Sequence, residues 1–172
     1  MVDKSKLPKF KYHPNIYELG IVEFSESECE CCNKKTEAYI QNMYTTEDIE
    51  CICMECVASG AAAEKFDGSF IQDAEEIDND EATDELFSRT PGYLSWQGEN
   101  WQACCNDYCE YLGTVGTKEL EEMGIADEIF EEDGSFDGFD DAREYLTKDG
   151  SLCGYLFRCL HCGKYKMYVD AD

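Results

Sequence analysis

Residues 29–32, Cys-Glu-Cys-Cys, and residues 53–56, Cys-Met-Glu-Cys, decide the fold of this 172-residue chain. Each stretch contains a Cys-x-x-Cys pair, and 20 residues separate the two pairs. A tight turn over Cys-x-x-Cys brings its two sulfurs to about 3.7 Å apart, as tetrahedral ligands about 2.3 Å from one zinc ion require. The pattern therefore predicts a structural zinc site formed by Cys29, Cys32, Cys53 and Cys56.

The residues between and after these pairs predict how the chain folds around the ion. Residues 37–44 read as a strand, from which a short hairpin returns the chain to the first pair. The second pair opens a helix that continues to residue 66, although Gly60 weakens this helix. The amides at a helix N-terminus favour thiolates. Knuckle, hairpin and helix in this order form a treble-clef-like finger, in which Cys31 and Cys51 are expected only to pack.

A second constellation involves Cys159 and Cys162, which form another Cys-x-x-Cys pair between expected strands at 152–158 and 165–169. The partners of this pair must come from elsewhere. Residues 100–112 show helical periodicity, which would place Cys105 and Cys109 on one helix face. We therefore predict a second zinc ion bound by Cys105, Cys109, Cys159 and Cys162. Cys104 and Cys153 remain alternative ligands, and buried free thiols are the alternative at both sites.

These elements predict an α+β fold of two zinc-centred lobes packed as one unit. The N-terminal zinc-finger lobe would span 1–70, an acidic connector 71–85, and a C-terminal lobe with a helix and a zinc-knuckle hairpin 86–172. Further helices are expected at 117–123 and 137–148. Trp96, Trp101 and the 61–66 helix should pack the lobes together.

The charge of the chain is strongly negative and uneven. Acidic residues outnumber basic ones 39 to 14, for a net charge of −25, and residues 71–147 hold 23 acids and 3 bases. Such a surface repels nucleic acid phosphates and favours a basic protein partner. The sequence has neither an apolar stretch of about 18 residues nor the apolar core of a secretory signal. We therefore expect a cytoplasmic location and no membrane partner. In that reducing compartment, clustered cysteines indicate metal ligands.

Both predicted zinc sites look closed, with four thiolates each, whereas a catalytic zinc ion normally keeps a water position. The chain has 2 histidines, His13 and His161, and neither forms an evident catalytic triad. We therefore expect no enzyme activity and no catalytic residue. A zinc- or thiol-dependent enzyme is the less favoured alternative.

Two features are candidates for partner binding. The stretch Arg-Thr-Pro-Gly-Tyr-Leu-Ser-Trp-Gln at 89–97 suggests a recognition groove anchored by Arg89, Tyr93 and Trp96. The competing interpretation is structural, with the arginine paired to nearby carboxylates and the aromatic rings in the core. Within the acidic stretch, the candidate contacts for a basic protein are Glu131, Glu132 and Asp133.

Motifs along most of the chain resemble a bacterial family of the CbrC type, which takes its name from a colicin-tolerance protein. The motifs are LPKFKYHP at 7–14, the first two Cys-x-x-Cys pairs, AAAEKFDGSF at 61–70, RTPGY at 89–93, SWQ at 95–97, CNDYCEYLG at 105–113 and LFRCLHCG at 156–163. The resemblance implies a bacterial cytoplasmic protein and supports Cys105 with Cys109, but it implies no particular biochemical activity. We therefore expect a zinc-stabilised acidic module that binds a basic protein and acts as a toxin tolerance or immunity factor. The alternative is a zinc-stabilised regulatory or assembly protein whose acidity serves solubility only.

Overall fold

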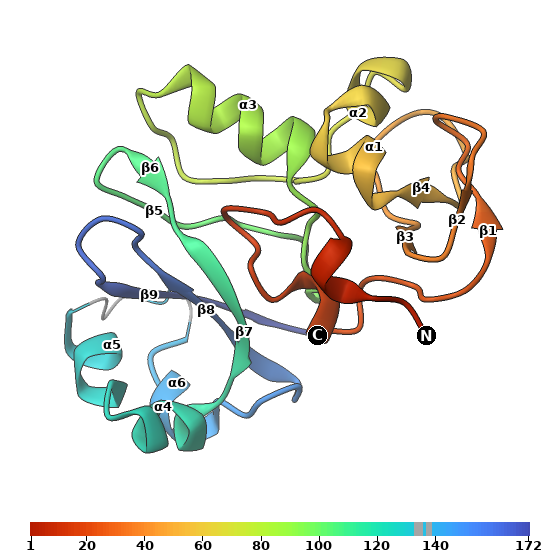
Figure 1. Ribbon diagram of the computed structural model, residues 1–172. Helices are drawn as coiled ribbons and strands as arrows, with labels where there is room; N and C mark the ends of the chain where they lie inside the picture. The colour runs from red at the N-terminus through yellow and green to blue at the C-terminus, as the bar shows by residue number, and fades with distance from the viewer. Residues whose placement is uncertain (133–135, 137–138) are drawn as a thin grey trace.

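A three-stranded antiparallel sheet forms the centre of the C-terminal half in the computed structural model, which describes residues 1–132, 136 and 139–172 (Figure 1). Its strands are β7 (Glu110–Val115), β8 (Leu152–Arg158) and β9 (Tyr165–Ala171), with β8 in the middle. The β8–β9 hairpin is in register from Leu152 opposite Ala171 to Arg158 opposite Tyr165. This hairpin was predicted, whereas β7 was not.

The N-terminal half follows the predicted order of knuckle, hairpin and helix. Two short 3-10 helices, η1 (Lys4–Lys6) and η2 (Ile16–Glu18), precede the paired strands β1 (Ser27–Glu28) and β2 (Lys35–Thr36). Strands β3 (Tyr39–Ile40) and β4 (Ile52–Cys53) then pair and lead into α1 (Met54–Ala58) and α2 (Ala61–Lys65). The predicted 37–44 strand is therefore only two residues long. The predicted single helix is divided because Gly60 adopts a left-handed φ of 78°.

Four further helices lie in the described part of the acidic middle of the chain. Helix α3 (Asp80–Arg89) begins after Asn79, whose side chain accepts a hydrogen bond from the Ala82 N–H, so the proposed connector at 71–85 includes the first part of a helix. Helix α4 (Thr117–Met123) was predicted and ends at Gly124, where φ is 73°. Helices α5 (Ala126–Glu132) and α6 (Ala142–Tyr145) follow, and α6 covers only part of the predicted 137–148 helix. None of the helices in the described ranges has the length and apolar character needed to cross a bilayer.

The predicted 100–112 helix is wrong, because this segment forms extended structure. Strand β5 (Ala103–Cys104) pairs with β6 (Asp107–Tyr108) across a two-residue turn, and β7 follows directly. Both turn residues, Cys105 and Asn106, have a φ of 55°. Two consecutive positive φ values characterise the tight turns that suit the twist of a hairpin, and asparagine tolerates this conformation.

Buried side chains form three clusters, and the second joins the two halves of the molecule. The first cluster surrounds α1 and α2, and the third lies between the sheet and helices α4, α5 and α6. The second is aromatic and includes Tyr12 from the N-terminal half together with Tyr93, Trp101 and Phe157. Trp101 is fully buried, as expected of a packing residue, whereas Trp96 is 54% exposed. The two halves therefore pack compactly as one unit, although Trp96 is not a core residue.

Candidate metal centres

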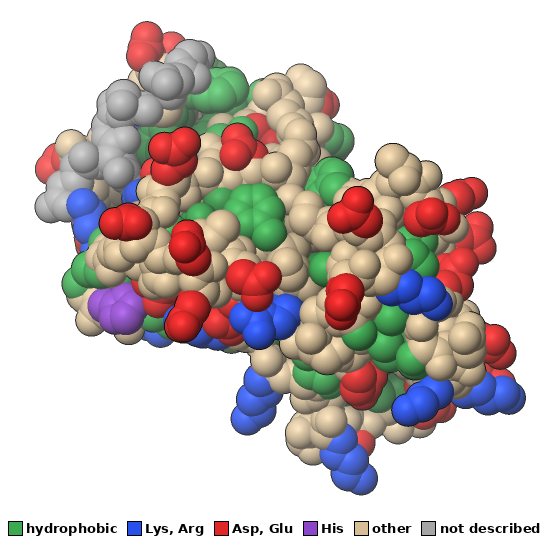
Figure 2. Space-filling model, turned by 90° about the horizontal axis from the view of Figure 1, so that it is seen from above, with side chains coloured by type: hydrophobic (Ala, Val, Ile, Leu, Met, Phe, Trp, Pro, Cys, Tyr) green, Lys and Arg blue, Asp and Glu red, His purple; other side chains and the backbone are tan. Residues whose placement is uncertain are grey.

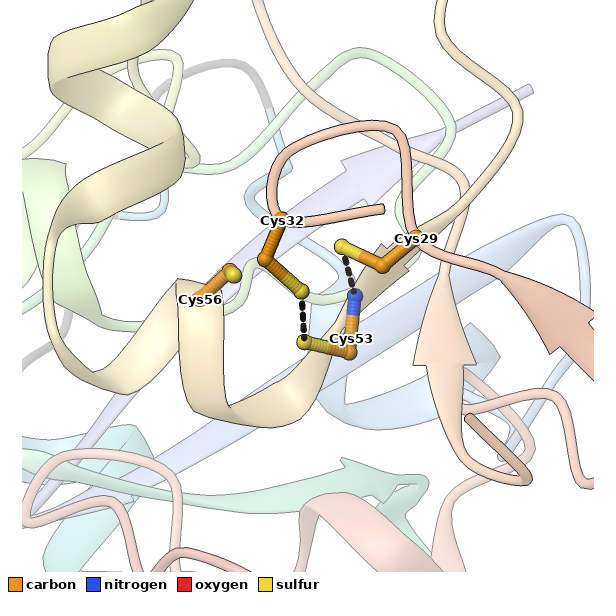
Figure 3. A group of neighbouring side chains, drawn as sticks. All are labelled: Cys29, Cys32, Cys53 and Cys56. Atoms are coloured by element: carbon orange, nitrogen blue, oxygen red, sulfur yellow. Dashed lines mark hydrogen bonds between the residues drawn. The ribbon is translucent and has the colours of Figure 1, made fainter. Parts of the chain in front are cut away.

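The first cysteine group lies where the treble-clef-like finger places it. Cys29 and Cys32 come from the loop between β1 and β2, Cys53 ends β4, and Cys56 lies in α1 (Figure 3). Their four sulfurs lie within 4.8 Å of one another, and the Cys32 and Cys53 sulfurs are 3.9 Å apart. These are the four cysteines that the sequence spacing predicted to share one ion.

The Cys-x-x-Cys knuckles at 29–32 and 159–162 have the same backbone conformation. In the first, the Asn33 N–H donates to the Cys29 carbonyl at 2.7 Å, and Asn33 has a φ of 58°. In the second, the Gly163 N–H donates to the Cys159 carbonyl at 3.1 Å, and Gly163 has a φ of 74°. Glycine and asparagine are the residues that adopt this left-handed conformation most readily. The residue after each of these two pairs therefore closes the turn, whereas Cys56 is followed by the continuing helix α1.

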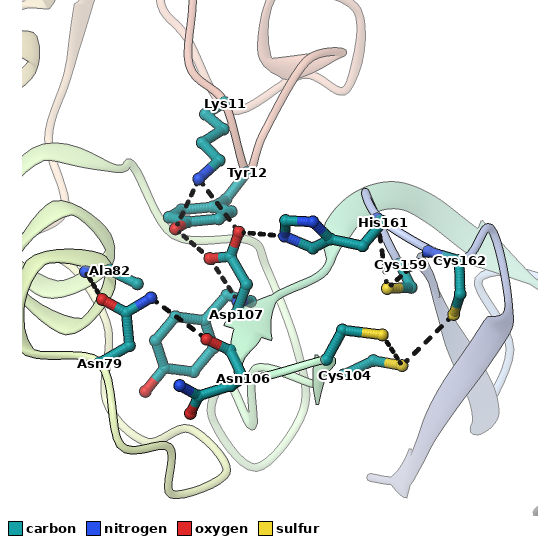
Figure 4. Close-up of polar contacts among 12 residues, drawn as sticks. Lys11, Tyr12, Asn79, Ala82, Cys104, Asn106, Asp107, Cys159, His161 and Cys162 are labelled. Atoms are coloured by element: carbon teal, nitrogen blue, oxygen red, sulfur yellow. Dashed lines mark hydrogen bonds and ion pairs between the residues drawn. The ribbon is translucent and has the colours of Figure 1, made fainter.

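The second cysteine group consists of Cys104, Cys105, Cys159 and Cys162 (Figure 4). Its sulfurs also lie within 4.8 Å of one another. The Cys104 sulfur is 3.7 Å from that of Cys105 and 3.6 Å from that of Cys162. These separations match the edge of a tetrahedron of sulfurs around zinc, about 3.7 Å.

Cys109 does not join this group, which corrects the predicted ligand set. It is fully buried between β6 and β7, and its carbonyl accepts a 2.9 Å hydrogen bond from the Trp101 indole. The prediction relied on a helix in which Cys105 and Cys109 share a face, but the chain turns at Cys105 and Asn106 instead. The signal that points to the correct set is the Asn-Asp pair at 106–107, because both residues favour tight turns. The other cysteines outside both groups are Cys31, Cys51 and Cys153.

The electrostatics within each group favour a bound cation. Burial raises the pKa of the Cys53 thiol to about 12. At Cys159, burial opposes ionisation, but the backbone N–H groups of Cys162 and His161 donate to its sulfur and lower its pKa to about 6. Burial likewise opposes ionisation of Cys29, whose pKa is nevertheless lowered by backbone N–H donors beginning with that of Cys53. Four thiolates this close repel one another, so full ionisation of either group requires a positive charge among the sulfurs.

The donor sets therefore fit a thiophilic metal ion. Each group offers four soft sulfur ligands within 4.8 Å of one another, and four cysteine ligands are typical of structural zinc sites. With four protein ligands, neither set reserves a position for water.

A buried carboxylate connects the second centre to the N-terminal segment, and sequence analysis missed this contact. Asp107 accepts hydrogen bonds from the Tyr12 hydroxyl at 2.6 Å and from His161 Nε2 at 2.8 Å, and Lys11 Nζ lies 3.1 Å away (Figure 4). Burial alone would raise the pKa of Asp107, but these partners lower it to about 2. His161, inside the Cys-x-x-Cys loop, thus points away from the sulfurs and fastens the knuckle to residues 11–12.

The turn that carries Cys105 is fastened on its other side to the start of α3. The Asn106 side chain accepts from the Asp78 N–H and donates to the Asp78 carbonyl, both at 2.9 Å. Asn79, which caps α3, donates to the Asn106 carbonyl at 3.1 Å. Elements from three parts of the chain therefore hold this hairpin in place.

The three predicted groove anchors lie in different environments. Arg89 forms an ion pair with Asp84 at 3.2 Å and lines a hollow of about 170 Å³ with Lys9 and Lys11. Tyr93 is buried and stacks on Tyr111, with ring centroids 4.4 Å apart. Trp96 lines a different, larger groove, which Tyr93 also lines. The structure therefore brings Tyr93 and Trp96 together but not Arg89.

Two of the three predicted acidic contacts, Glu131 and Glu132, lie at the end of α5. Glu131 is exposed. Glu132 is the last residue of the helix, and Asp133 lies outside the described residues.

Comparison with known proteins places the chain in a family. Residues 7–171 match the family described as "Uncharacterised protein family (UPF0167)". A UPF0167 protein of Pseudomonas aeruginosa is 34% identical over 182 residues, which cover 96% of this chain and 97% of the relative. UPF0167 proteins of Mycobacterium bovis and Mycobacterium tuberculosis are each 34% identical, over 96% of this chain and 94% of theirs. No solved structure matches. The link to colicin tolerance stays a prediction, but the match spans nearly the whole length: the chain belongs to the UPF0167 family.

Proposed function

We propose that this protein is a zinc-stabilised acidic module that binds a basic protein and has no catalytic turnover of its own. The observation that carries the proposal is the net charge of −25, most of it within residues 71–147. On the face seen in Figure 2, acidic side chains are spread over the surface, whereas the fewer Lys and Arg side chains lie mostly in the lower half of the view. A basic partner approaching such a surface is attracted over distances of about 8–10 Å at ordinary salt.

The proposal assigns two zinc ions a structural role. Each cysteine group supplies four sulfurs, so each ion would have a complete set of protein ligands. The short strands and helices around the first group are not stable alone, because helices of five residues and two-residue strands bury little surface. Metal binding would supply the missing folding free energy.

Within this proposal, tolerance of a protein toxin is the most specific role. Toxins that attack nucleic acid grip phosphates and therefore carry basic surfaces. An acidic partner binds such a surface quickly, since complementary charge raises the association rate more than it slows dissociation. This role is supported by the charge of the chain and by the resemblance to a family named after a colicin-tolerance protein.

The test of partner binding is a salt-dependent capture experiment. The immobilised protein is exposed to bacterial lysate, captured proteins are identified, and the association rate of each purified partner is measured at low and physiological salt. We expect a basic partner whose association slows at least tenfold with salt. The triple variant Glu131→Lys, Glu132→Lys and Asp133→Lys should slow association further.

A matched control separates the acidic segment from total charge. The triple variant Glu47→Lys, Asp48→Lys and Glu64→Lys makes the same charge change at exposed positions outside 71–147. A partner whose association responds equally to both variants, or to neither, would contradict a specific role for the acidic segment. Acidity would then serve solubility, and a zinc-stabilised regulatory or assembly protein would be the better interpretation.

The absence of turnover is tested through metal coordination. Native mass spectrometry should find two zinc ions per chain, and X-ray absorption should find four sulfur neighbours around each. An oxygen neighbour at either ion would indicate an open position and would favour a zinc enzyme instead.

A further inference from the structure

A groove of about 510 Å³ separates the zinc-finger half of the chain from the segment at 91–99. One wall comes from residues 40–44, which follow β3, and the other from the Pro-Gly-Tyr-Leu-Ser-Trp-Gln stretch that sequence analysis singled out. Three large side chains in this region are exposed: Tyr44 by 45%, Leu94 by 57% and Trp96 by 54%. Neither cysteine group lines this groove.

The groove contains a carboxylate, that of Glu99, which is only 7% exposed. The Tyr44 hydroxyl donates to its Oε2 at 2.5 Å, and the Gln72 N–H donates to the same atom at 3.3 Å. Both donors are neutral, and no ion pair within the described ranges involves Glu99. Burial raises the pKa of Glu99 above its ordinary value, although the hydrogen bonds from the Tyr44 hydroxyl and from backbone N–H groups act in the opposite direction.

Two glycines leave room for this arrangement. A Cβ atom on Gly92 would lie 2.1 Å from Glu99 Oε1, and one on Gly98 would lie 1.9 Å from the Gln72 side-chain oxygen. Gly98 also has a φ of 104°, which other residues rarely adopt. The backbone of the 91–99 segment is therefore shaped around the carboxylate and its neighbour.

The wall that carries Trp96 is held rigidly. The Trp96 indole donates to the Gly150 carbonyl at 3.1 Å. The backbone N–H of Gln97 donates to the Asp170 carboxylate at 3.0 Å, and its side chain donates to the Ala171 carbonyl at 2.9 Å. A ligand entering the groove thus meets a wall that is already fixed, which lowers the entropic cost of binding.

We propose that this groove receives an arginine or lysine side chain of the basic protein partner. The Glu99 carboxylate would pair with the cationic end, while the exposed rings of Tyr44 and Trp96 would pack against the apolar stem or the guanidinium face. The inference rests on the proposed function and adds to it a defined contact, distinct from the diffuse attraction of the acidic surface. The competing interpretation is that Glu99 only ties Tyr44 and Gln72 together.

The test uses a short capped peptide of alternating glycine and arginine, with a fluorescent label, and the same peptide with citrulline in place of arginine. Citrulline keeps the shape of the side chain but carries no charge. Affinity is measured by fluorescence anisotropy at physiological salt. We expect the Glu99→Gln variant to bind the arginine peptide about tenfold more weakly, as the loss of one largely desolvated charge pair implies. The citrulline peptide should bind the native chain more weakly still, because it also loses the attraction of its other charges to the acidic surface.

A matched control removes the same charge elsewhere. Glu121→Gln lies at an exposed position of α4, away from the groove, and should change affinity by less than about twofold. Trp96→Ala, at a half-exposed position, should weaken binding of the arginine peptide and provides a second test if Glu99→Gln fails to fold. The intrinsic fluorescence of Trp96 should also respond to the peptide, whereas Trp101 is fully buried.

The outcomes separate this inference from the proposed function. Equal weakening by Glu99→Gln and Glu121→Gln, or unchanged binding by Trp96→Ala, would show that the acidic surface attracts basic peptides without using the groove. That result overturns the groove proposal and leaves the proposed function standing. A third outcome would overturn both the groove proposal and the proposed function. In that case neither salt nor either carboxylate variant changes the affinity for the arginine peptide, and salt does not change the association rate of the captured partner.

Discussion

Exchanging Cys104 for alanine, rather than Cys109, should remove the second metal ion. Cys104 contributes a sulfur 3.6 Å from that of Cys162, whereas Cys109 is fully buried and outside the group. Structural zinc binding supplies about 10–16 kcal/mol when all ligands are present. An equal share for each of four ligands is about 3 kcal/mol, which corresponds to more than a hundredfold loss of zinc affinity.

The Cys109→Ala variant provides the matched control, because it removes the same sulfur atom from a site without a metal. It should retain two ions per chain. Its cost is that of a small cavity in the aromatic core, about 1–2 kcal/mol of unfolding free energy.

Native mass spectrometry under competition with a chelator measures metal content, and urea unfolding measures stability. We expect one ion in Cys104→Ala and two in Cys109→Ala. The opposite pattern, with two ions retained by Cys104→Ala and one lost by Cys109→Ala, would refute the turn at Cys105 and Asn106. A helix over 100–112 would then be the better description of this segment.

Three other predictions follow from the structure. A chelator should remove the second ion first, since Cys105 and Cys162 are exposed whereas three of the four cysteines in the first group are buried. Time-resolved metal release should therefore show a fast phase from the second group, and this phase should be absent in Cys104→Ala. Burial lowers the pKa of His13 from 6.5 to about 4. As the pH falls, His13 is therefore protonated in the unfolded chain before it is protonated in the folded chain. The free energy of unfolding should therefore fall by about 3 kcal/mol between pH 6.5 and pH 4, and urea unfolding of His13→Phe should lack this part of the pH dependence. Gly60→Ala should cost about 1–2 kcal/mol in thermal unfolding, because φ is 78° there and the added Cβ would lie 3.2 Å from the Arg89 side chain; unchanged stability would contradict the left-handed break between α1 and α2.

Local signals predicted the parts of the structure that local chemistry determines. The Cys-x-x-Cys spacing and the strands around Cys159 and Cys162 are both read within a few residues. Helix α4 is similar, since Thr117 opens it and Gly124 closes it. The first cysteine group could be assembled because both of its pairs carry the same recognisable pattern.

The second group could not be assembled in this way, because its other half carries no such pattern. Residues 100–112 bury Trp101, Tyr108 and Cys109, a set that also suits one face of a helix. What decides for a hairpin lies far along the chain: Tyr12 and Lys11 bind Asp107 from about 95 positions away, and residues 78–79 hold Asn106. Periodicity within one window contains no information about these partners.

The count of charges along the sequence likewise does not tell which carboxylates are buried, and their burial affects how the protein would recognise a partner. Among the described residues of the acidic stretch, three carboxylates are buried: Glu99, Asp107 and Glu110. Asp107 is compensated by Lys11, and Glu110 pairs with Arg158 at 2.6 Å, so neither offers its charge to a partner. Glu99 differs because its hydrogen-bond donors are the neutral groups of Tyr44 and Gln72. Exposed acids attract a basic protein from a distance, but screening and mobility make each of them worth little on contact. A buried carboxylate without a paired cation gains more binding free energy when a cation pairs with it. At Glu99, therefore, a diffuse attraction could become a specific contact.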